Sequence, residues 1–169
     1  MTRLVTERLI LRAARDEDLG PLFTIFSNPR AMAYWSTPPV QDINVTRAWI
    51  EKTKKSLPRR YFVLEHQGVV IGTGGIHSDN EIGFILHPDH WRKGFMREAM
   101  LAVIAHIWAT TDFAKITADA DPDNIASVGF LAGLGFHETH RAKNTFCIDG
   151  RWTDSVYFAL ARPGLSIAQ

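Results

Sequence analysis

The sequence predicts a mixed α/β fold built around one mostly antiparallel sheet. Short strand-like segments separated by turn residues lie between residues 60 and 87, which predicts an antiparallel meander. A long amphipathic pattern follows from about residue 94 and predicts a helix. Because a helix that crosses between two strands usually makes them parallel neighbours, strands four and five of the order βααβββαβαββ are expected to run parallel.

The start of the chain predicts one strand and one helix. Residues 6–14, TERLILRAA, alternate enough to form the first strand. Residues 15–29 follow with apolar side chains at helical spacing. Asp16 or Asp18 is expected to cap this helix, and Pro29 is expected to end it.

A proline-rich aromatic loop, residues 33–41, separates this helix from a second helix at residues 42–56. Asp42 is expected to be its N-cap, because a short carboxylate accepts hydrogen bonds from the free amides of a first turn. One side of the helix is expected to carry the apolar residues Val45, Ala48 and Trp49.

The meander consists of strands at residues 60–66, 69–77 and 81–87, with turns at Gln67–Gly68 and Ser78–Asp79–Asn80. The helix after it should bury a stripe of residues at i, i+3, i+4 and i+7. This stripe contains Met96, Ala99, Met100, Val103, Ile104, Ile107 and Trp108.

The last part of the chain predicts a strand at residues 114–121 and a short helix at 124–133. Two final strands, 136–146 and 151–162, are expected to join across Asp149–Gly150, a dipeptide typical of tight hairpins.

Length and charge limit the possible functions. With 169 residues, 46% of them hydrophobic, the chain is expected to form a single domain spanning 1–169. The net charge of +1 favours neither a nucleic acid nor an anionic membrane as partner. The first residues lack the apolar core of a signal peptide, and no apolar run is as long as a membrane span.

Cys147 is the only cysteine, so no internal disulfide can form. This is typical of a reduced cytoplasmic protein. Cys147 lies where a predicted strand runs into a turn, and a buried inert thiol is expected there rather than a catalytic nucleophile.

The start of the third helix predicts an anion site. A first helical turn has unpaired N–H groups and a partial positive charge. Gly94 lets the backbone turn into the helix and lets a bulky anion approach the amides of residues 92–97. Arg92, Lys93 and Arg97 add positive charge. The alternative is an ordinary strand–loop–helix connection with solvated basic side chains.

Other nucleotide and metal motifs do not fit. The sequence has no G-x-x-x-x-G-K-[ST] and no G-x-G-x-x-G after a strand. Residues 119–124, DADPDN, begin like a calcium loop, but Asn124 and Phe130 stand where that loop needs Gly and Glu. No metal site is therefore expected.

Four ordered segments together resemble the GNAT acetyltransferases, specifically their RimJ/RimL branch. They are TERLILR at 6–12, EIGFILHPDHWRKGFMREAM at 81–100, DADPDNIASVGFLAGLGF at 119–136 and DSVYFALAR at 154–162. The resemblance covers almost the whole chain. It implies the GNAT fold, with splayed parallel strands four and five, and acetyl-CoA-dependent transfer of an acetyl group to an amine.

The resemblance also implies how acetyl-CoA, the cosubstrate, would bind without a metal. The pyrophosphate would lie on the amides that open the third helix. The pantetheine arm would add to strand four as an extra strand and meet Asn124 at the end of strand five. The cofactor-binding residues expected in this way are Ile85, Leu86, His87, Arg92, Lys93, Gly94, Phe95, Met96, Arg97, Asn124 and Ser127.

Two positions depart from the family pattern. Its cradle is usually Q/R-x-x-G-x-G/A, of which only the middle glycine, Gly94, is present. Met96 replaces a small residue and is expected to pack in the core and narrow the cradle. Leu131 stands where many members have a tyrosine that faces the CoA sulfur.

The resemblance implies two catalytic residues. Glu81 matches a strand-four glutamate that serves as base in related enzymes, and strand alternation puts it on the face of Gly83 and Ile85. The alternative is a solvated glutamate at the end of a hairpin. Ser127 matches the group that RimL-like enzymes place near the departing sulfur, to which it would donate a hydrogen bond. The alternative is a serine on the helix surface.

The acceptor implied is a primary amine, either an N-terminal α-amine of a peptide or protein or a small-molecule amine. The expected substrate-binding residues are Tyr34, Trp35, Glu81 and Tyr157. The protein is expected to be a monomer or a homodimer. A non-catalytic acyl-CoA-binding or sensor domain is the alternative function, and a solute-binding protein unrelated to CoA is a third.

Overall fold

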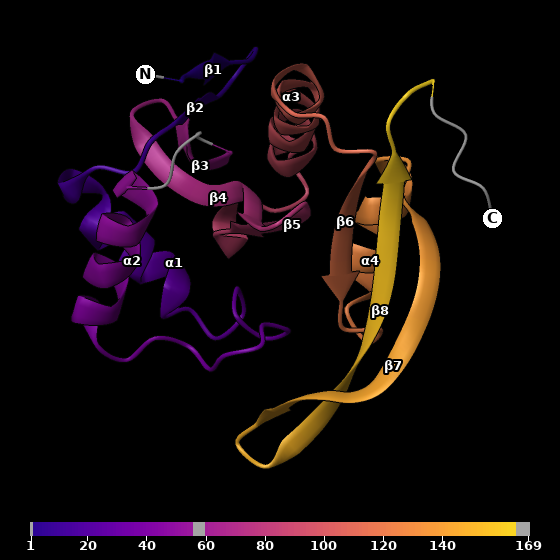
Figure 1. Cartoon of the computed structure of the whole chain (residues 1–169). Coiled ribbons are helices and arrows are strands. Elements are labelled where there is room, and N and C mark those ends of the chain that lie inside the picture. Colours follow the sequence, from indigo (N-terminus) through magenta and orange to yellow (C-terminus); the bar gives the residue numbers. More distant parts are fainter. Residues whose placement is uncertain (1, 56–59, 165–169) are drawn as a thin grey trace.

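A computed structural model describes residues 2–55 and 60–164. Within these residues the chain forms one eight-stranded sheet in the order β1-β2-β3-β4-β5-β6-β8-β7 (Figure 1). The strands are β1 (Leu4–Val5), β2 (Ile10–Arg12), β3 (Tyr61–His66), β4 (Val69–Ser78), β5 (Glu81–Leu86), β6 (Lys115–Ala120), β7 (His137–Ile148) and β8 (Arg151–Ala161). The helices are α1 (Leu19–Phe26), α2 (Ile43–Lys55), α3 (Phe95–Thr110) and α4 (Ile125–Gly133), with 3₁₀ turns at Asp16–Asp18 and Pro88–His90.

The predicted mixed, mostly antiparallel sheet is confirmed. Only the pair β5–β6 is parallel among the described strands, and α3 crosses between them as expected. The turns Gln67–Gly68 and Asp149–Gly150 both have positive φ at their two residues, as tight hairpins require.

The first strand differs from its prediction, because residues 6–14 do not form one strand. The backbone N–H of Thr6 donates to the carbonyl of Leu9 at 3.0 Å and reverses the chain between β1 and β2. The sheet therefore has one strand more than the predicted order, and the predicted strands four and five are β5 and β6.

The second helix begins as predicted but is rotated. Asp42 accepts a hydrogen bond from the N–H of Asn44 at 2.9 Å and caps α2. Val45 and Ala48, expected on the apolar side, are exposed, and Trp49 is half-buried. The buried side is Thr46, Ile50 and Thr53. The methyl groups of the two threonines let them pack in an apolar environment, but a search for strongly apolar residues does not find them. The last predicted helical residue, Ser56, lies outside the described residues.

Two layers of helices enclose the sheet. Alternate residues of each strand point to opposite faces, so Val63, Val70 and Ile85 pack against α1 and α2. Phe62, Ile71 and the remaining apolar face pack against α3 and α4. The predicted stripe of α3 is confirmed at Ala99, Met100, Val103, Ile104 and Ile107, while Met96 and Trp108 are partly buried at its margin.

The prediction that Cys147 is buried is wrong, because Cys147 is exposed. The β7–β8 hairpin extends beyond the rest of the sheet (Figure 1), and no helix covers the part that carries Cys147. Most residues of β7 are therefore exposed on both faces.

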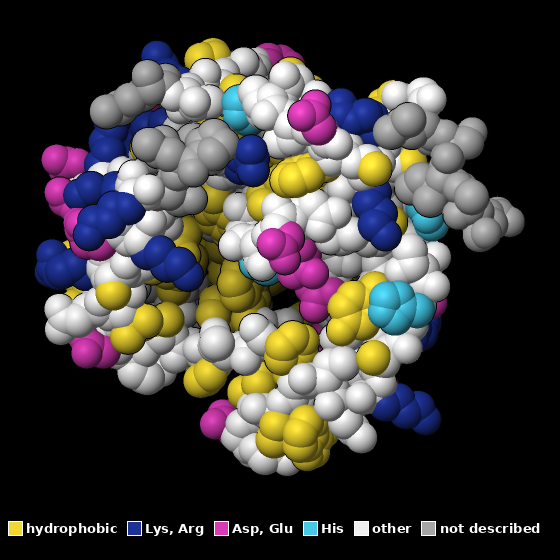
Figure 2. Space-filling model, viewed as in Figure 1, with side chains coloured by type: hydrophobic (Ala, Val, Ile, Leu, Met, Phe, Trp, Pro, Cys, Tyr) yellow, Lys and Arg dark blue, Asp and Glu magenta, His cyan; other side chains and the backbone are white. Residues whose placement is uncertain are grey.

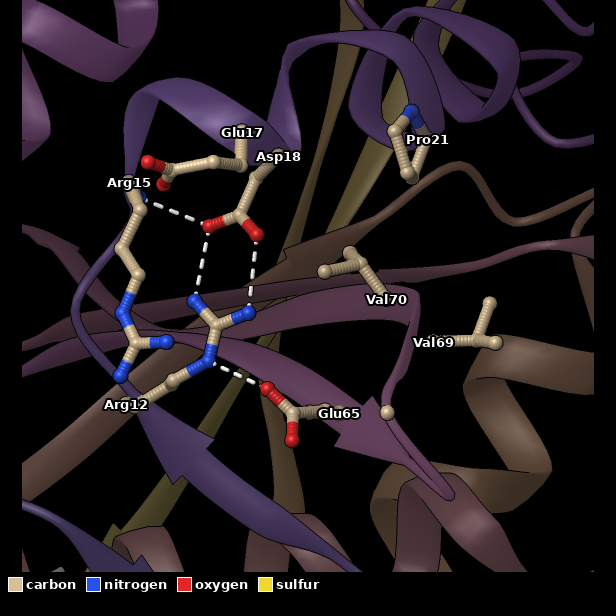
Figure 3. A pocket seen from close by; sticks show the side chains of 9 residues that line it. Arg12, Arg15, Glu17, Asp18, Pro21, Glu65, Val69 and Val70 are labelled. Carbon is tan, nitrogen blue, oxygen red and sulfur yellow. Dashed lines mark hydrogen bonds and ion pairs between the residues drawn. The ribbon is translucent and has the colours of Figure 1, made fainter.

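Arg12 at the end of β2 fixes the start of α1 through ion pairs (Figure 3). Its two Nη atoms donate to the two carboxylate oxygens of Asp18 at 2.8 Å, and its Nε donates to Glu65. Asp18 also accepts the N–H of Arg15 at 2.7 Å. Asp18 precedes α1 as predicted, but its carboxylate binds this network rather than an amide of the helix.

We predict that Asp18→Ala lowers the free energy of unfolding by about 3 to 5 kcal/mol, because it leaves the buried Arg12 guanidinium without its main counter-ion. Urea unfolding measures this loss. Glu17→Ala, at an exposed neighbour, is the matched control and should stay within about 0.5 kcal/mol of the unmodified chain. Equal stability of the two variants would show that the pairing contributes nothing.

Candidate functional site

The backbone before α3 forms a concave row of amides. Gly94 is left-handed, with φ 79°, and Arg92 also has a positive φ of 59°. Glu98 is the first residue whose N–H reaches back into the turn, to the carbonyl of Gly94 at 3.0 Å. The N–H groups of the three residues before it, Phe95, Met96 and Arg97, have no partner within the helix, as is usual for a first turn. These amides are suited to an anion.

The predicted cations around this turn differ in where they point. Arg92 is exposed. Lys93 donates from Nζ to the carbonyl of Asp89 at 2.7 Å, which folds it back over the loop. Arg97 donates to the carbonyl of Gly133 at 2.8 Å and so joins α3 to the end of α4. The charge of Arg97 therefore lies between the two helices.

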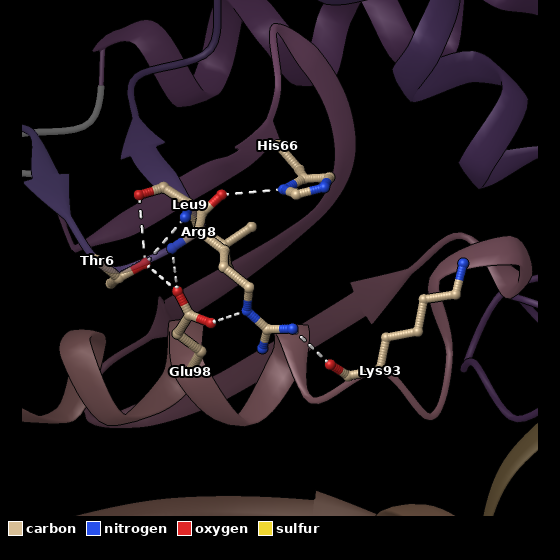
Figure 4. A network of polar contacts seen from close by, with 6 residues as sticks. All are labelled: Thr6, Arg8, Leu9, His66, Lys93 and Glu98. Carbon is tan, nitrogen blue, oxygen red and sulfur yellow. Dashed lines mark hydrogen bonds and ion pairs between the residues drawn. The ribbon is translucent and has the colours of Figure 1, made fainter.

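A polar network anchors the start of α3 to the turn between β1 and β2 (Figure 4). Glu98 accepts hydrogen bonds from the Thr6 hydroxyl at 2.6 Å and from the N–H and Nε of Arg8, both at 2.7 Å. Arg8 also donates to the carbonyl of Lys93 at 2.8 Å and lies over the buried Phe95 ring. Burial opposes ionisation of Glu98, but these hydrogen bonds outweigh it and lower its pKa.

The parallel strands separate beyond a single register pair, Glu81 with Thr117. Beyond this pair, β5 and β6 do not pair with each other, so the backbone of β5 that faces β6 is open. The N–H of His87 donates to the carbonyl of Ile71 on β4 at 2.9 Å. Because backbone groups alternate along a strand, Phe84 and Leu86 direct theirs toward the gap.

The contacts of the pantetheine arm stay a prediction, and the hydrogen bonds of β5 indicate which backbone groups are free to make them. Among Ile85, Leu86 and His87, only Leu86 has its backbone groups on the open side. Its carbonyl already accepts the indole N–H of Trp91 at 2.8 Å. Phe84, which was not predicted, is the second residue on this edge. The missed signal is the parity of the strand, which depends on the register with β4.

Asn124 and Ser127, at the start of α4, are hydrogen-bonded to each other. Asn124 caps α4 by accepting the N–H of Ser127 at 3.1 Å, and its side-chain NH₂ donates to the Ser127 hydroxyl oxygen at 2.9 Å. The hydroxyl proton of Ser127 is thus left to donate elsewhere. Leu131 is fully buried in the core, so it lines no site.

On the opposite face of the sheet, three ionisable side chains gather at the gap. His77 Nε2 lies 3.0 Å from Glu81 Oε1, with the side chains 46% and 33% exposed. Asp119 is two residues beyond Thr117 on β6 and therefore shares their face. Figure 2 shows acidic side chains at the centre of this face, beside a hollow. The sequence interpretation identified Glu81 and missed His77 and Asp119, because neither belongs to a motif.

The surroundings shift the ionisation of both carboxyl groups. Burial raises the pKa of Glu81, the charge of Asp119 raises it further, and His77 lowers it. Burial also raises the pKa of Asp119. Two carboxyl groups with raised pKa values beside an open gap are typical of a site that exchanges protons.

The predicted aromatic residues lie on this same side. Trp35 packs partly buried against the cluster that contains Ile85, and Tyr34 is exposed. Tyr157 is paired in register with Asp119 and stacks on His140 with 4.3 Å between ring centroids. The aromatic side chains thus come from the loop before α2 and from β8.

The described ranges contain no cluster of three or more His, Cys, Asp or Glu side chains with the geometry of a metal site. None of the helices described is both long and apolar enough to cross a membrane.

Comparison with known proteins gives consistent matches. The family profile described as "Acetyltransferase (GNAT) domain" matches residues 8–137. The uncharacterized N-acetyltransferase p20 of Bacillus licheniformis is 30% identical over 173 residues, which cover 96% of this chain and 97% of that protein. The [ribosomal protein uS5]-alanine N-acetyltransferase of Escherichia coli is also 30% identical, over 95% of this chain and 91% of that protein.

A solved structure agrees with the fold. The spermidine N-acetyltransferase of Vibrio cholerae, in complex with CoA and spermine, superposes with a TM-score of 0.80. The two chains are 24% identical, and the superposed part covers 91% of this chain and 95% of the Vibrio cholerae chain.

We predict a pH-dependent effect of Glu98→Gln on stability. Since the folded pKa of Glu98 is lowered, its carboxylate stabilises the fold above its unfolded pKa of about 4.3 and loses this effect as the pH falls through the folded pKa. The variant should be less stable at pH 7, and the difference should shrink below about pH 4. Chemical unfolding across this range measures it, with Glu7→Gln, an exposed neighbour, as control. A difference independent of pH would contradict the ionic role.

Proposed function

Because the chain belongs to the acetyltransferase (GNAT) family, we propose that it transfers an acetyl group from acetyl-CoA directly to a primary amine at the gap between β5 and β6. The observation that carries this proposal is the position of the gap. It opens beside the free amides of α3 on one face of the sheet and beside Glu81 on the other.

The residues present fit acetyl-CoA. Gly94 has a φ of 79°, a left-handed conformation that other residues rarely adopt, so glycine suits the turn that leads into these amides. The amides of residues 95–97, with Arg92, would bind the pyrophosphate. The backbone of Phe84 and the N–H of Leu86 would pair with the pantetheine amides. When bound, acetyl-CoA supplies an acetyl group activated as a thioester.

Glu81 accepts a proton from the acceptor amine in this proposal. At pH 7, deprotonating a lysine-like amine of pKa about 10.4 costs about 4 to 5 kcal/mol, and an α-amine of pKa about 8 costs only about 1 kcal/mol. A carboxylate whose pKa is raised is a stronger base than an ordinary glutamate, so the environment of Glu81 suits this task.

Ser127 donates a hydrogen bond to the sulfur that leaves. Its hydroxyl oxygen is held by Asn124, which orients the proton toward solvent or a bound group. A serine hydroxyl is too weak an acid to protonate a thiolate, so its contribution is stabilisation of charge. Asn124 thus supports Ser127 and caps α4, and its predicted contact with the arm is secondary to these bonds.

The acceptor is a peptide or protein α-amine or a small-molecule amine. Tyr34, Trp35 and Tyr157 would flank it, beside Glu81. The relatives are consistent with either class, because one acts on the alanine of a ribosomal protein and another is named a spermidine N(1)-acetyltransferase. We further propose that residues 1–169 form a single domain acting in the cytoplasm, as a monomer or a homodimer.

We predict that the protein releases CoA thiol from acetyl-CoA only when a suitable amine is present. A panel of peptides with free N-termini, polyamines and amino acids, followed with a thiol-reactive dye, measures this release. Glu81→Gln should lower kcat/KM by about 100-fold at pH 7, within the usual range for removal of a general base. Tight CoA binding without turnover of any amine would favour the sensor alternative instead.

We also predict that Ser127→Ala lowers kcat by about 10-fold and changes KM for acetyl-CoA by less than twofold, because the bond to sulfur strengthens as charge develops. Steady-state kinetics separates the two constants. Ser27→Ala, after the end of α1, is the control and should leave both unchanged. An effect on KM alone would exclude the role at the leaving group.

A further inference from the structure

The pairing of β4 with β5 is interrupted beside Glu81. Ile76 pairs with Ile82 and Ser78 pairs with Glu81, so β4 has one extra residue at this point, His77. Such a β-bulge leaves the extra residue without a directly opposed partner on the neighbouring strand. His77 shares a face with Gly75, which pairs with Gly83, so it lies on the face of Gly83 and Glu81, with 3.0 Å between its Nε2 and Glu81 Oε1.

Gly83 on β5 provides the space for the imidazole ring. A Cβ at Gly83 would lie 3.0 Å from Cδ2 of His77 and 3.6 Å from its Nε2. The ring therefore rests on the backbone of β5, and any side chain at residue 83 would displace it. The φ of Gly83 is not in the left-handed region, so the backbone conformation does not require glycine there.

We propose that His77 is a positioning residue for Glu81, held by the bulge and by the bare backbone of Gly83. It donates from Nε2 to one carboxylate oxygen and leaves the other oxygen toward the gap, where the acceptor amine arrives. This inference rests on the proposed role of Glu81 as base.

The charged groups around Glu81 give the proposal a pH signature. His77 faces it from β4, Asp79 from the turn before β5, and Asp119 from β6. Tyr157, stacked on His140, lies beyond Asp119 on β8. Burial, Asp119 and Asp79 raise the pKa of Glu81, and His77 lowers it. Without His77 the pKa of Glu81 should rise further, so the acid limb of kcat/KM should move to higher pH.

Three variants test this. His77→Ala should lower kcat by about 10-fold or more through misplacement of the base, and should leave KM for acetyl-CoA within about twofold. His77→Gln keeps a neutral hydrogen-bond donor and should restore most of kcat. Gly83→Ala keeps every ionisable group but displaces the ring, so it should reproduce the loss of His77→Ala.

The double variant His77→Ala with Gly83→Ala separates positioning from steric obstruction. If Gly83 acts through His77, the second substitution should add no further loss. His137→Ala, at an exposed histidine of β7, and Gly20→Ala, where an added Cβ meets nothing within 4 Å, are the matched controls. Both should retain unmodified activity.

Wild-type kcat and an unshifted acid limb in His77→Ala would overturn the proposal, as would a full additional loss in the double variant. NMR titration of the Glu81 carboxyl carbon gives a readout that needs no turnover, and its pKa should be higher in His77→Ala than in the unmodified chain. An enzyme that acetylates no amine would refute the proposed function, whereas an active enzyme insensitive to His77 would refute only this inference.

Discussion

The parallel pairing of β5 with β6 is limited to Glu81 and Thr117, and the rest of the structure is organised around this point. Every other neighbouring pair of described strands is antiparallel, and most are paired over several residues. At this one place the sheet is continuous enough to hold its two halves together but leaves two strand edges facing each other without pairing. Unpaired strand edges attract extended chains. Here the two open edges face each other across the gap between β5 and β6, where an extended ligand could pair with them.

The two faces of the sheet then present opposite polarity to the same opening. On one face, α3 follows β5 and begins with free amides and the positive end of its dipole. On the other face, Glu81 and Asp119 present carboxylates that a cationic amine can approach. An anionic cosubstrate and a cationic acceptor can therefore enter from opposite faces of the sheet, each meeting groups of opposite charge. Direct transfer between them needs no covalent intermediate on the protein, which agrees with an exposed Cys147 far along a hairpin.

Much of this could be read from the sequence, because local patterns determine it. The hairpin turns, the buried stripe of α3 and the glycine that opens it depend on residues close in the chain. The rotation of α2 could not be read, because Thr46 and Thr53 are polar by type and become buried only when α2 packs against the rest of the chain. The role of Asp18 was missed for a similar reason, since the Arg12 guanidinium that it binds is held on its other side by Glu65, which is distant in sequence.

The candidate site also combines residues that local motifs indicate with residues that only the folded chain brings together. Glu81 and Ser127 were predicted from ordered motifs, whereas His77 belongs to no motif and is the one extra residue of β4 where its register with β5 shifts. The alternation of β4 puts His77 on the face of Glu81, but its unopposed position beside Gly83 follows from the pairing of the two strands, which no local pattern shows. The direction of the Phe84 backbone groups likewise depends on pairing with β4, through the hydrogen bond of His87 to Ile71 and the alternation along β5.

The outer edges of the sheet differ in a way that affects how copies of the chain behave when crowded. At one end β1 is only two residues long, too short to template another strand. At the other end β7 has twelve residues with a free side, yet its register with β8 shifts twice and Asn144 has a positive φ of 53°. The ion pair of Glu138 with Arg141 adds charge along the same edge. An irregular, charged edge is a poor surface for strand-to-strand growth, so neither outer edge of the described sheet offers a second copy of the chain a long regular strand to pair with.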